Sequence, residues 1–332
     1  MSPFEPATPR APKSFADLRA FRIFQHVPDA KLAKLAALAR EQIVGAGQII
    51  YDQGSTGEDF FVVLAGTVEG HRSTPTGRQP FTCIRVGQIF GEVSFLASNP
   101  RDVTTISVSS TALLCFNGAR VRRAIASDHE LGASLMRAFW HSLAAKIRQA
   151  NMFLCNLMPP SPNETAPPVA AHGHSVDVKP RSKLDLFAED GLSAAELRLV
   201  ATTLRAESFE AGGTLFLEGA NGDCLYIVVE GNVRISRRVS GRSESVLATL
   251  GRGEVFGEMA LVDDQLRSAD ACAGPDGATV LALSRHDLDE VLQRPSVAAS
   301  QFLNLVCRVL SHRLREMVNL LAAGRHRTGS FV

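Results

Sequence analysis

The sequence predicts a mainly β protein with helices (α+β), built from two similar domains in tandem, and two observations support this fold class. The first is self-similarity, because residues 21–155 and 184–322 repeat one pattern along most of the 332-residue chain. The second is that each copy contains short apolar runs broken by glycine, a pattern typical of antiparallel strands in a barrel or sandwich. Each copy is also long enough to bury a core of its own.

The two copies can be compared element by element. Each begins with apolar residues at helical spacing, in IFQHVPDAKLAKLAALA from Ile23 and LFAEDGLSAAELRLVATTL from Leu186. Each ends with a long amphipathic helix, expected at 130–155 and at about 297–322. Strand runs lie between, and their turn glycines match in pairs: Gly54 with Gly219, Gly57 with Gly222, and Gly66 with Gly231.

The segment between the copies has a different composition. It is rich in proline and small polar residues and shows no periodicity, which predicts an extended flexible linker. The expected organisation is an N-terminal tail at 1–20, domain A at 21–155, the linker at 156–183, domain B at 184–322 and a C-terminal tail at 323–332.

Composition excludes several classes of protein. The chain has 35 basic and 34 acidic side chains, so no overall charge points to nucleic acid. Prolines and charges occupy the start, where a signal peptide would be apolar, and no apolar run reaches membrane-spanning length. We therefore expect a cytoplasmic protein that binds neither nucleic acid nor membrane. The six cysteines stand singly, without the close pairs of zinc sites, so no metal site is expected.

One motif occurs in both copies, as GQIFGEVSFLASNPR and as GEVFGEMALVDDQLR. In each, Phe-Gly-Glu is followed by an arginine nine positions after the glutamate. A glycine that enters a short helix lets main-chain amides approach an anion. An enclosed arginine adds charge-assisted hydrogen bonds to phosphate, worth about 1.5–3 kcal/mol. The glutamate cannot bind phosphate, but it can accept a hydroxyl hydrogen and orient the arginine. One anion site beside one hydroxyl site fits a cyclic ribonucleotide.

With these residues the chain resembles the cyclic-nucleotide-binding domain family, as found in catabolite activator protein, the regulatory subunits of protein kinase A and nucleotide-gated channels. The likeness covers nearly all of both copies, and the tandem arrangement is most similar to the kinase regulatory subunit. It implies two β jelly rolls, each with N-terminal helices, a phosphate-binding motif at FGE…R, and a long C-terminal helix that closes as a lid. Aligning the lid helices with the family places Asn151 and Met317 near the base.

The resemblance also implies site residues. In domain B the residues that match the family's phosphate and ribose contacts and their neighbours are Phe256, Gly257, Glu258, Met259, Ala260, Arg267, Ser268 and Ala269. In domain A the corresponding residues are Phe90, Gly91, Glu92, Val93, Ser94, Arg101, Asp102 and Val103. An alternative is that the motif serves folding alone, with each arginine paired to its own glutamate.

Domain A departs from the family pattern at Asp102, where a small or hydroxyl residue is usual. A carboxylate about 4 Å from the phosphate would oppose binding by about 4 kcal/mol at an effective dielectric constant of 20, enough to cancel the arginine. A side chain that points outward would cost far less. The first site can therefore be intact, weakened, or altered to recognise the amino group of guanine.

The sequence contains no nucleophile elbow, metal-ligand spacing or paired carboxylates, so no enzyme activity is expected. Only 11 residues follow Leu321, too few for a helix-turn-helix. The predicted function is a cAMP receptor that signals by lid-helix movement to a protein partner, or to its own dimer through the long helices. cGMP is a possible ligand. The alternatives are a nucleotide-free interaction scaffold of the same fold and a receptor for cyclic di-GMP.

Overall fold

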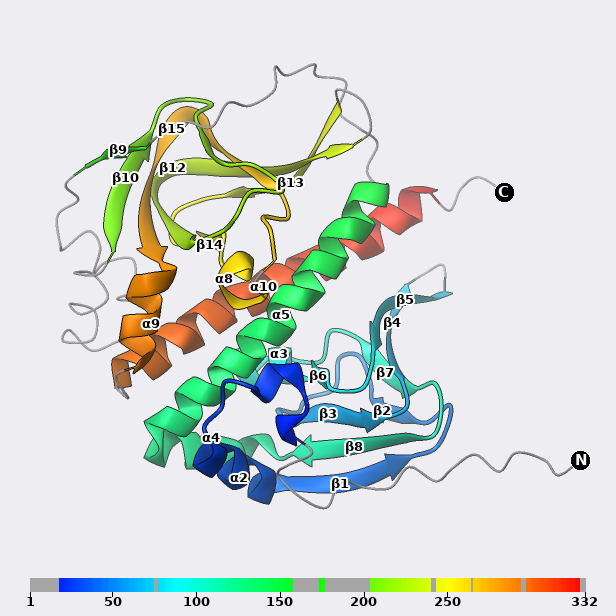
Figure 1. The fold of residues 1–332 in the computed structure, drawn as a ribbon. Coiled ribbons are helices and arrows are strands. Elements are labelled where there is room, and N and C mark those ends of the chain that lie inside the picture. The colour runs from blue at the N-terminus through cyan, green and yellow to red at the C-terminus, as the bar shows by residue number, and fades with distance from the viewer. Residues whose placement is uncertain are drawn as a thin grey trace, which may run out of the picture. The chain divides into compact units, whose positions relative to one another are not determined.

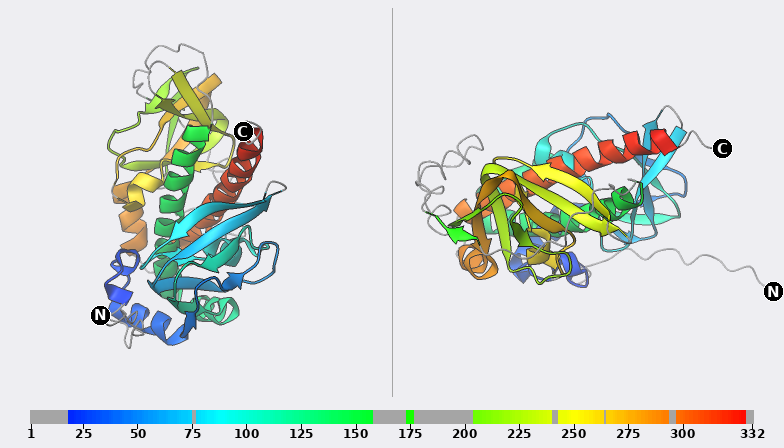
Figure 2. Two further views of the ribbon diagram at one scale, coloured as in Figure 1. Left: turned by 90° about the vertical axis from the view of Figure 1, so that its right-hand side faces the viewer. Right: turned by 90° about the horizontal axis from the view of Figure 1, so that it is seen from above.

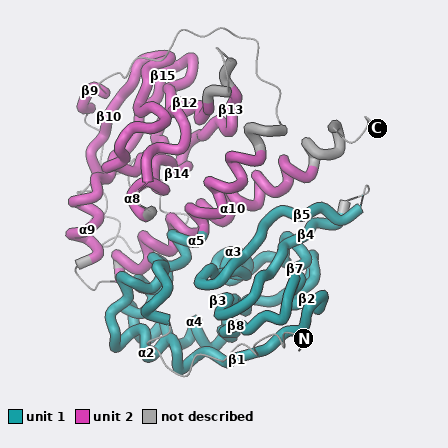
Figure 3. Tube along the Cα trace, turned by 45° about the vertical axis from the view of Figure 1, so that its right-hand side comes forward, with its two compact units in different colours: residues 1–142 teal, residues 143–332 magenta. Residues whose placement is uncertain are grey.

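The computed structural model describes residues 18–74, 77–157, 173–176, 204–239, 243–263, 265–293 and 297–328. The helical segment expected from Leu186 and most of the expected linker and tails lie outside these residues. The chain forms two compact units, Met1–Ser142 and Leu143–Val332 (Figure 3).

Unit 1 contains two four-stranded antiparallel sheets (Figures 1 and 2). The first has the order β1-β8-β3-β6 and the second the order β2-β7-β4-β5. This arrangement agrees with the predicted mixed fold of helices and a β jelly roll. The strands are β1 (Ala39–Val44), β2 (Ile49–Tyr51), β3 (Phe60–Ala65), β4 (Val68–Thr74), β5 (Gly77–Ile84), β6 (Ile89–Phe90), β7 (Thr104–Ser107) and β8 (Thr111–Phe116).

Strand β3 shows how the sequence divides the core of unit 1. Side chains alternate between the two faces of a strand. Phe61 and Val63 belong to the cluster that also includes residues of β4, β5, β6 and β8, between the two sheets. Phe60 lies on the other face, where its ring centroid is 5.4 Å from that of Phe95 and 5.0 Å from that of Phe139. The run FFVV is therefore buried on both faces.

The helices described in unit 1 are η1 (Arg22–Phe24), α2 (Asp29–Leu38), α3 (Glu92–Ala97), α4 (Gly118–Ser127) and the first part of α5 (His129–Leu157). Of these, α3 and α5 contact that second face through Phe95 and Phe139. Helix α5 corresponds to the long helix expected at 130–155. It is one continuous helix that begins in unit 1 and ends in unit 2 (Figure 1).

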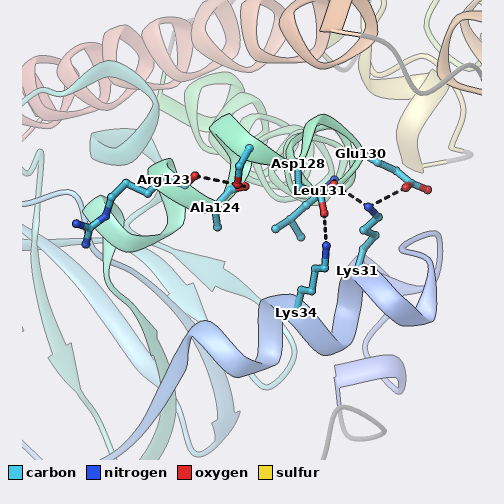
Figure 4. Close-up of polar contacts among 8 residues, drawn as sticks. Lys31, Lys34, Arg123, Ala124, Asp128, Glu130 and Leu131 are labelled. Atoms are coloured by element: carbon cyan, nitrogen blue, oxygen red, sulfur yellow. Dashed lines mark hydrogen bonds and ion pairs between the residues drawn. The ribbon is translucent and has the colours of Figure 1, made fainter.

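Asp128 fixes the start of α5 (Figure 4). Its Oδ1 accepts from the amide of Leu131 at 3.0 Å and from Nζ of Lys31 at 2.7 Å, and its Oδ2 accepts from Nζ of Lys34 at 2.6 Å. Lys31 also pairs with Glu130 at 2.9 Å. The hydrogen bonds from Lys31, and next those from Lys34, hold the pKa of Asp128 well below its usual range. One carboxylate thus caps α5 and joins it to α2.

We expect Asp128→Ala to destabilise unit 1 by about 1–2 kcal/mol at pH 7, because it removes a helix cap and two ion pairs. A depressed pKa in the folded state means that this stabilisation is present above the unfolded pKa, near 3.8, and is lost as the pH falls below it. The difference between wild type and variant should shrink from pH 5 toward about pH 2.5 in denaturant unfolding. A difference that does not depend on pH would contradict this assignment.

Unit 2 repeats the β architecture in one seven-stranded sheet system. The two strands β3 and β4 of unit 1 correspond to one continuous strand in unit 2, β12, which passes through Gly231. The short strand that ends at the phenylalanine of the FGE motif pairs in the same way in both units, with Phe61 opposite Phe90 and Tyr226 opposite Phe256. The strands are β9 (His174–Ser175), β10 (Arg205–Phe209), β11 (Thr214–Phe216), β12 (Cys224–Val239), β13 (Ser243–Leu250), β14 (Val255–Phe256) and β15 (Asp270–Ser284).

Besides the last part of α5, the described residues of unit 2 form α8 (Met259–Asp263), α9 (Arg285–Gln293) and α10 (Val297–Thr328). Helix α10 corresponds to the second expected long helix, and Phe302, Leu303 and Leu310 on it are buried. None of the described helices combines the length and the apolar character needed to cross a membrane. Within the same described ranges, no three metal-ligating side chains gather in one place.

Candidate functional site

In unit 1 the FGE motif forms a tight corner between β6 and α3. Gly91 has φ +85°, and a Cβ there would lie 2.8 Å from the carbonyl oxygen of Asp59 and 2.9 Å from Nη1 of Arg101. Only glycine fits this backbone conformation and this close approach. Arg101 donates from Nη1 to the carbonyl of Gly91 at 2.9 Å and from Nη2 to that of Asp59 at 2.6 Å. Its guanidinium carbon lies 4.3 Å from the ring centroid of Tyr51.

Unit 2 repeats this geometry with different side chains. Gly257 has φ +75°, and a Cβ there would lie 2.6 Å from Nη1 of Arg267. Arg267 donates from Nη1 to the carbonyl of Gly257 at 2.6 Å and from Nη2 to that of Cys224 at 2.8 Å. Phe216 replaces Tyr51 beneath the guanidinium, with its ring centroid 4.1 Å away. The two FGE motifs are therefore built alike.

Both arginines are buried cations whose hydrogen bonds run to neutral main-chain carbonyls. Arg101 and Arg267 are each 5% exposed, and burial lowers the pKa of both. Nε of Arg267 has no hydrogen-bond partner among the described residues. Carbonyl acceptors position a guanidinium without cancelling its charge. Each arginine is thus held in place with its charge available to an anion.

The two glutamates differ in their partners. Oε1 of Glu92 accepts a hydrogen bond from the hydroxyl of Ser142 on α5 at 3.0 Å. Glu258 is fully buried, and neither of its carboxylate oxygens has a hydrogen-bond partner within the described part of the chain. Nη1 of Arg313 on α10 lies 3.9 Å from its Oε1. Burial raises the pKa of Glu258, and the charge of Arg313 partly opposes that shift.

All eight predicted residues of domain B line one pocket in unit 2. The pocket therefore places the Arg267 guanidinium, the Gly257 turn and the Glu258 carboxylate around a common space. Its lining is Arg148, Asn151, Phe216, Ile235, Phe256, Gly257, Glu258, Met259, Ala260, Arg267, Ser268, Ala269 and Arg313.

Five lining residues were not among the predicted site residues. Phe216 had a detectable signal, because Tyr51 stands at the same position before the turn glycine in the first copy. Ile235 lies on β12 as an ordinary strand residue. Arg148, Asn151 and Arg313 come from the long helices. The resemblance had placed Asn151 near the base, whereas Arg148 and Arg313 had no signal, because periodicity shows which residues share a face but not what that face contacts.

In unit 1 the structure brings Gly91, Glu92 and Arg101 together as predicted, while Asp102 is partly exposed. Glu92, Ser94 and Phe90 are buried. Val93 and Val103 are partly buried at the edges of the motif. In neither unit does the arginine depend on its own glutamate for position, since main-chain carbonyls hold it.

We expect Gly222→Ala to disturb the second motif, whereas the matched change Gly57→Ala is tolerated in the first. A Cβ at Gly222 would lie 2.2 Å from Cβ of Ala260 and 3.0 Å from Cζ of Arg267. At Gly57 the nearest atom, Nη2 of Arg101, is 3.6 Å away. The first change should cost about 1–3 kcal/mol and the second under about 0.5 kcal/mol. Thermal unfolding of both variants measures this, and equal effects would contradict it.

Comparison with known proteins places this geometry in a family. The family model described as "Cyclic nucleotide-binding domain" matches residues 41–128 and 206–295, together more than half of the chain. The cyclic AMP receptor protein of Thermus thermophilus is 38% identical over 126 residues, which cover 38% of this chain and 56% of that protein.

Two relatives match across both copies. The cGMP-dependent protein kinase egl-4 of Caenorhabditis briggsae is 21% identical over 270 residues, covering 78% of this chain and 30% of the kinase. The regulatory subunit of cAMP-dependent protein kinase from Mycosarcoma maydis is 22% identical over 269 residues, covering 77% of this chain and 42% of the subunit. The chain thus spans about half or less of the length of these relatives. With two matched segments, each containing the glycine corner and the buried arginine, the chain belongs to the cyclic nucleotide-binding domain family and has two copies of that domain.

Proposed function

We propose that this protein is a receptor for cAMP, which binds the second site, and that binding is transmitted through helix α10 to a protein partner or to a second copy of the chain. The observation that supports this most directly is the pair of Arg267 and Glu258 in one pocket. Arg267 is a buried cation with neutral acceptors, and Glu258 has two buried acceptor oxygens that no group among the described residues hydrogen-bonds. A ligand with an anionic phosphate and a sugar hydroxyl would satisfy both.

The proposal names cAMP because a relative with a single shared domain, at 38% identity, is a cyclic AMP receptor protein. The relatives also include a cGMP-dependent kinase, so cGMP is the principal competing nucleotide. For the first site the proposal is that Gly91, Glu92 and Arg101 take the same roles, with Asp102 reducing affinity for the phosphate.

Calorimetric titration of the protein with cAMP, cGMP and cyclic di-GMP tests this function. We expect saturable cAMP binding at micromolar or lower concentration, with one equivalent from the second site and a second, weaker equivalent from the first. If cyclic di-GMP bound more tightly than cAMP, the protein would be a receptor for cyclic di-GMP. If none of the three produced heat or displaced a fluorescent cAMP analogue, the protein would instead be an interaction scaffold of the same fold.

The route of the signal follows from the contact between Glu258 and Arg313. A ribose hydroxyl that donates to Glu258 would compete with Arg313 for its carboxylate, whose Oε1 is 3.9 Å from Nη1 of Arg313. Ligand binding should therefore change the environment of α10. Hydrogen exchange of residues 297–322 with and without saturating cAMP measures this. Unchanged exchange would contradict the helix movement, even if cAMP binds.

The raised pKa of Glu258 predicts a pH dependence of binding at the second site. The carboxylate must be ionised to accept the hydroxyl hydrogen with full strength. Because burial raises its pKa, protonation begins at a higher pH than for an exposed glutamate. Affinity for cAMP should fall as the pH is lowered from 8 to 5, and Glu258→Gln should remove this dependence while weakening binding at pH 8. An equally steep dependence in the variant would assign it to another group.

A further inference from the structure

Strand β1 lies at the edge of the first sheet of unit 1 (Figure 1). It pairs antiparallel with β8 on one side, and no described strand pairs with its other side. Arg40, Glu41, Gln42 and Ile43 in this strand are all exposed. A strand edge of this kind presents a row of main-chain donors and acceptors to which another strand can add.

Unit 2 shows that the matching edge accepts a strand. There β10 pairs antiparallel with β9, which comes from the segment between the two copies. Ser208 lies opposite His174, and the amide of Val176 donates to the carbonyl of Ala206 at 3.1 Å. In an antiparallel ladder both main-chain groups of one residue face the same side. The main-chain groups of Ala206 and Ser208 therefore face outward, toward β9.

The repeat transfers this geometry to unit 1. Counted back from the matched turn glycines, Ala206 corresponds to Glu41 and Ser208 to Ile43. The main-chain groups of Glu41 and Ile43 thus face the open side of β1, where no group in the described ranges hydrogen-bonds them. The edge that β9 covers in unit 2 is open in this part of unit 1.

Exposed apolar side chains gather at the end of this edge. Ile43 is 61% exposed, Val108 is 52% exposed and Ile49 is 47% exposed. The turn after β1 holds these segments together, because the amide of Gly47 donates to the carbonyl of Ser107 at 2.7 Å. Exposed apolar groups beside an open strand edge are typical of a surface that another chain covers.

The charges on β1 select one register for pairing with β1 of a second copy. Around a two-fold axis, outward main-chain groups must face outward groups. An axis at Arg40 or at Glu41 would place like charges directly opposite each other, which is unfavourable. An axis at Ile43 would carry the pairing past Val44, where the strand ends. An axis at Gln42 avoids both, and it pairs Glu41 of each copy with Ile43 of the other.

We propose that two copies of this chain associate through β1, so that their four-stranded sheets join into one antiparallel sheet around a two-fold axis at Gln42. Glu41 and Ile43 then exchange main-chain hydrogen bonds between the copies. Such a contact uses the same surface on both copies and closes after two of them. It uses neither the pocket residues of unit 2 nor the FGE motifs, so it goes beyond the proposed receptor function and does not depend on it.

Disulfide crosslinking tests the register. Gln42 would face its own counterpart as a non-hydrogen-bonded pair, with Cα atoms about 4.5 Å apart, which is within reach of a disulfide. Both variants carry Cys115→Ala, because Sγ of Cys115 lies 3.4 Å from Oε1 of Gln42 and could form a bond within one chain. Under mild oxidation, Gln42→Cys should give a covalent dimer on a non-reducing gel. Glu41→Cys is the matched control and should stay near the background of the Cys115→Ala protein, since it faces Ile43.

Sedimentation velocity of the nucleotide-free chain, from micromolar to millimolar concentration, measures the association itself. Ile43→Glu places a carboxylate opposite Glu41 of the second copy and should weaken the dimer about tenfold or more. Ile43→Lys places a cation there and should retain the dimer. Val86→Glu is the matched control, because Val86 is also exposed, at 51%, and lies outside β1.

The contrary outcomes are distinct. A wild-type chain that stays monomeric at every concentration would leave the edge to an extended segment of another protein and overturn the inference. A dimer that Ile43→Glu leaves unchanged would form through another surface. Equal weakening by both Ile43 variants, or equal crosslinking of Glu41→Cys and Gln42→Cys, would contradict the register and with it the proposal. None of these results bears on cAMP binding, which the titration tests separately.

Discussion

Arg267→Ala is expected to reduce the affinity of the second site for cAMP by about 30-fold to several thousand-fold. Truncating one partner of a buried, hydrogen-bonded charge pair typically costs about 2–5 kcal/mol, and each 1.4 kcal/mol is a factor of ten. Arg267 meets the conditions for a large effect, because it is 5% exposed and is fixed by the carbonyls of Gly257 and Cys224. Calorimetric titration measures the loss directly.

Arg101→Ala is the matched control for this experiment. It removes the corresponding guanidinium from unit 1, where the carbonyls of Gly91 and Asp59 hold it. It should remove only the weaker equivalent and leave the stronger one in place. Thermal unfolding of both variants shows whether the domains remain folded, since each arginine also holds two chain segments together. Full affinity in a folded Arg267→Ala protein would refute the phosphate role of this residue.

Phe60→Ala is expected to have the largest effect on stability, about 3–5 kcal/mol. Phe60 is fully buried and packs against three rings, at centroid distances of 4.7 Å to Phe116, 5.0 Å to Phe139 and 5.4 Å to Phe95. Alanine would leave a cavity at the point where one strand and two helices meet Phe60: β8 through Phe116, α5 through Phe139 and α3 through Phe95. The helices would then lose their common contact with the sheet.

Denaturant unfolding followed by tryptophan fluorescence measures this loss. Trp140 is the single tryptophan of the chain, is 1% exposed and lies in unit 1, so its signal reports that unit. Val86→Ala is a control within the same unit, since Val86 is 51% exposed and should change stability by no more than about 0.5 kcal/mol. A comparable effect of both changes would show that Phe60 is not the centre of this core.

Local patterns were enough to predict the tandem repeat, the mixed fold and the FGE…R motif. These features depend on short-range rules: glycine at turns, alternation along strands and helical periodicity. The helix expected at 130–155 spans His129–Leu157, and the one expected at about 297–322 spans Val297–Thr328. The domain boundaries at 21–155 and 184–322 stay predictions, as does ligand binding by the two sets of site residues.

The partners of the buried groups were decided by tertiary structure alone. The motif suggested that the glutamate orients the arginine. In the structure Arg101 is held by the carbonyl of Asp59 and Arg267 by that of Cys224, and both acceptors lie outside the motif. These acceptors are main-chain atoms, which no residue type reveals.

The sequence by itself determined that two cyclic nucleotide-binding domains follow each other and where their FGE…R motifs lie. It could not determine that Asn151, near the end of the first copy, faces the motif of the second copy more than 100 residues further on. Helical periodicity specifies which residues share a face, whereas the surface that covers this face depends on how distant segments pack. Local chemistry thus located the candidate site, and the packing of the long helices supplied the rest of its lining residues.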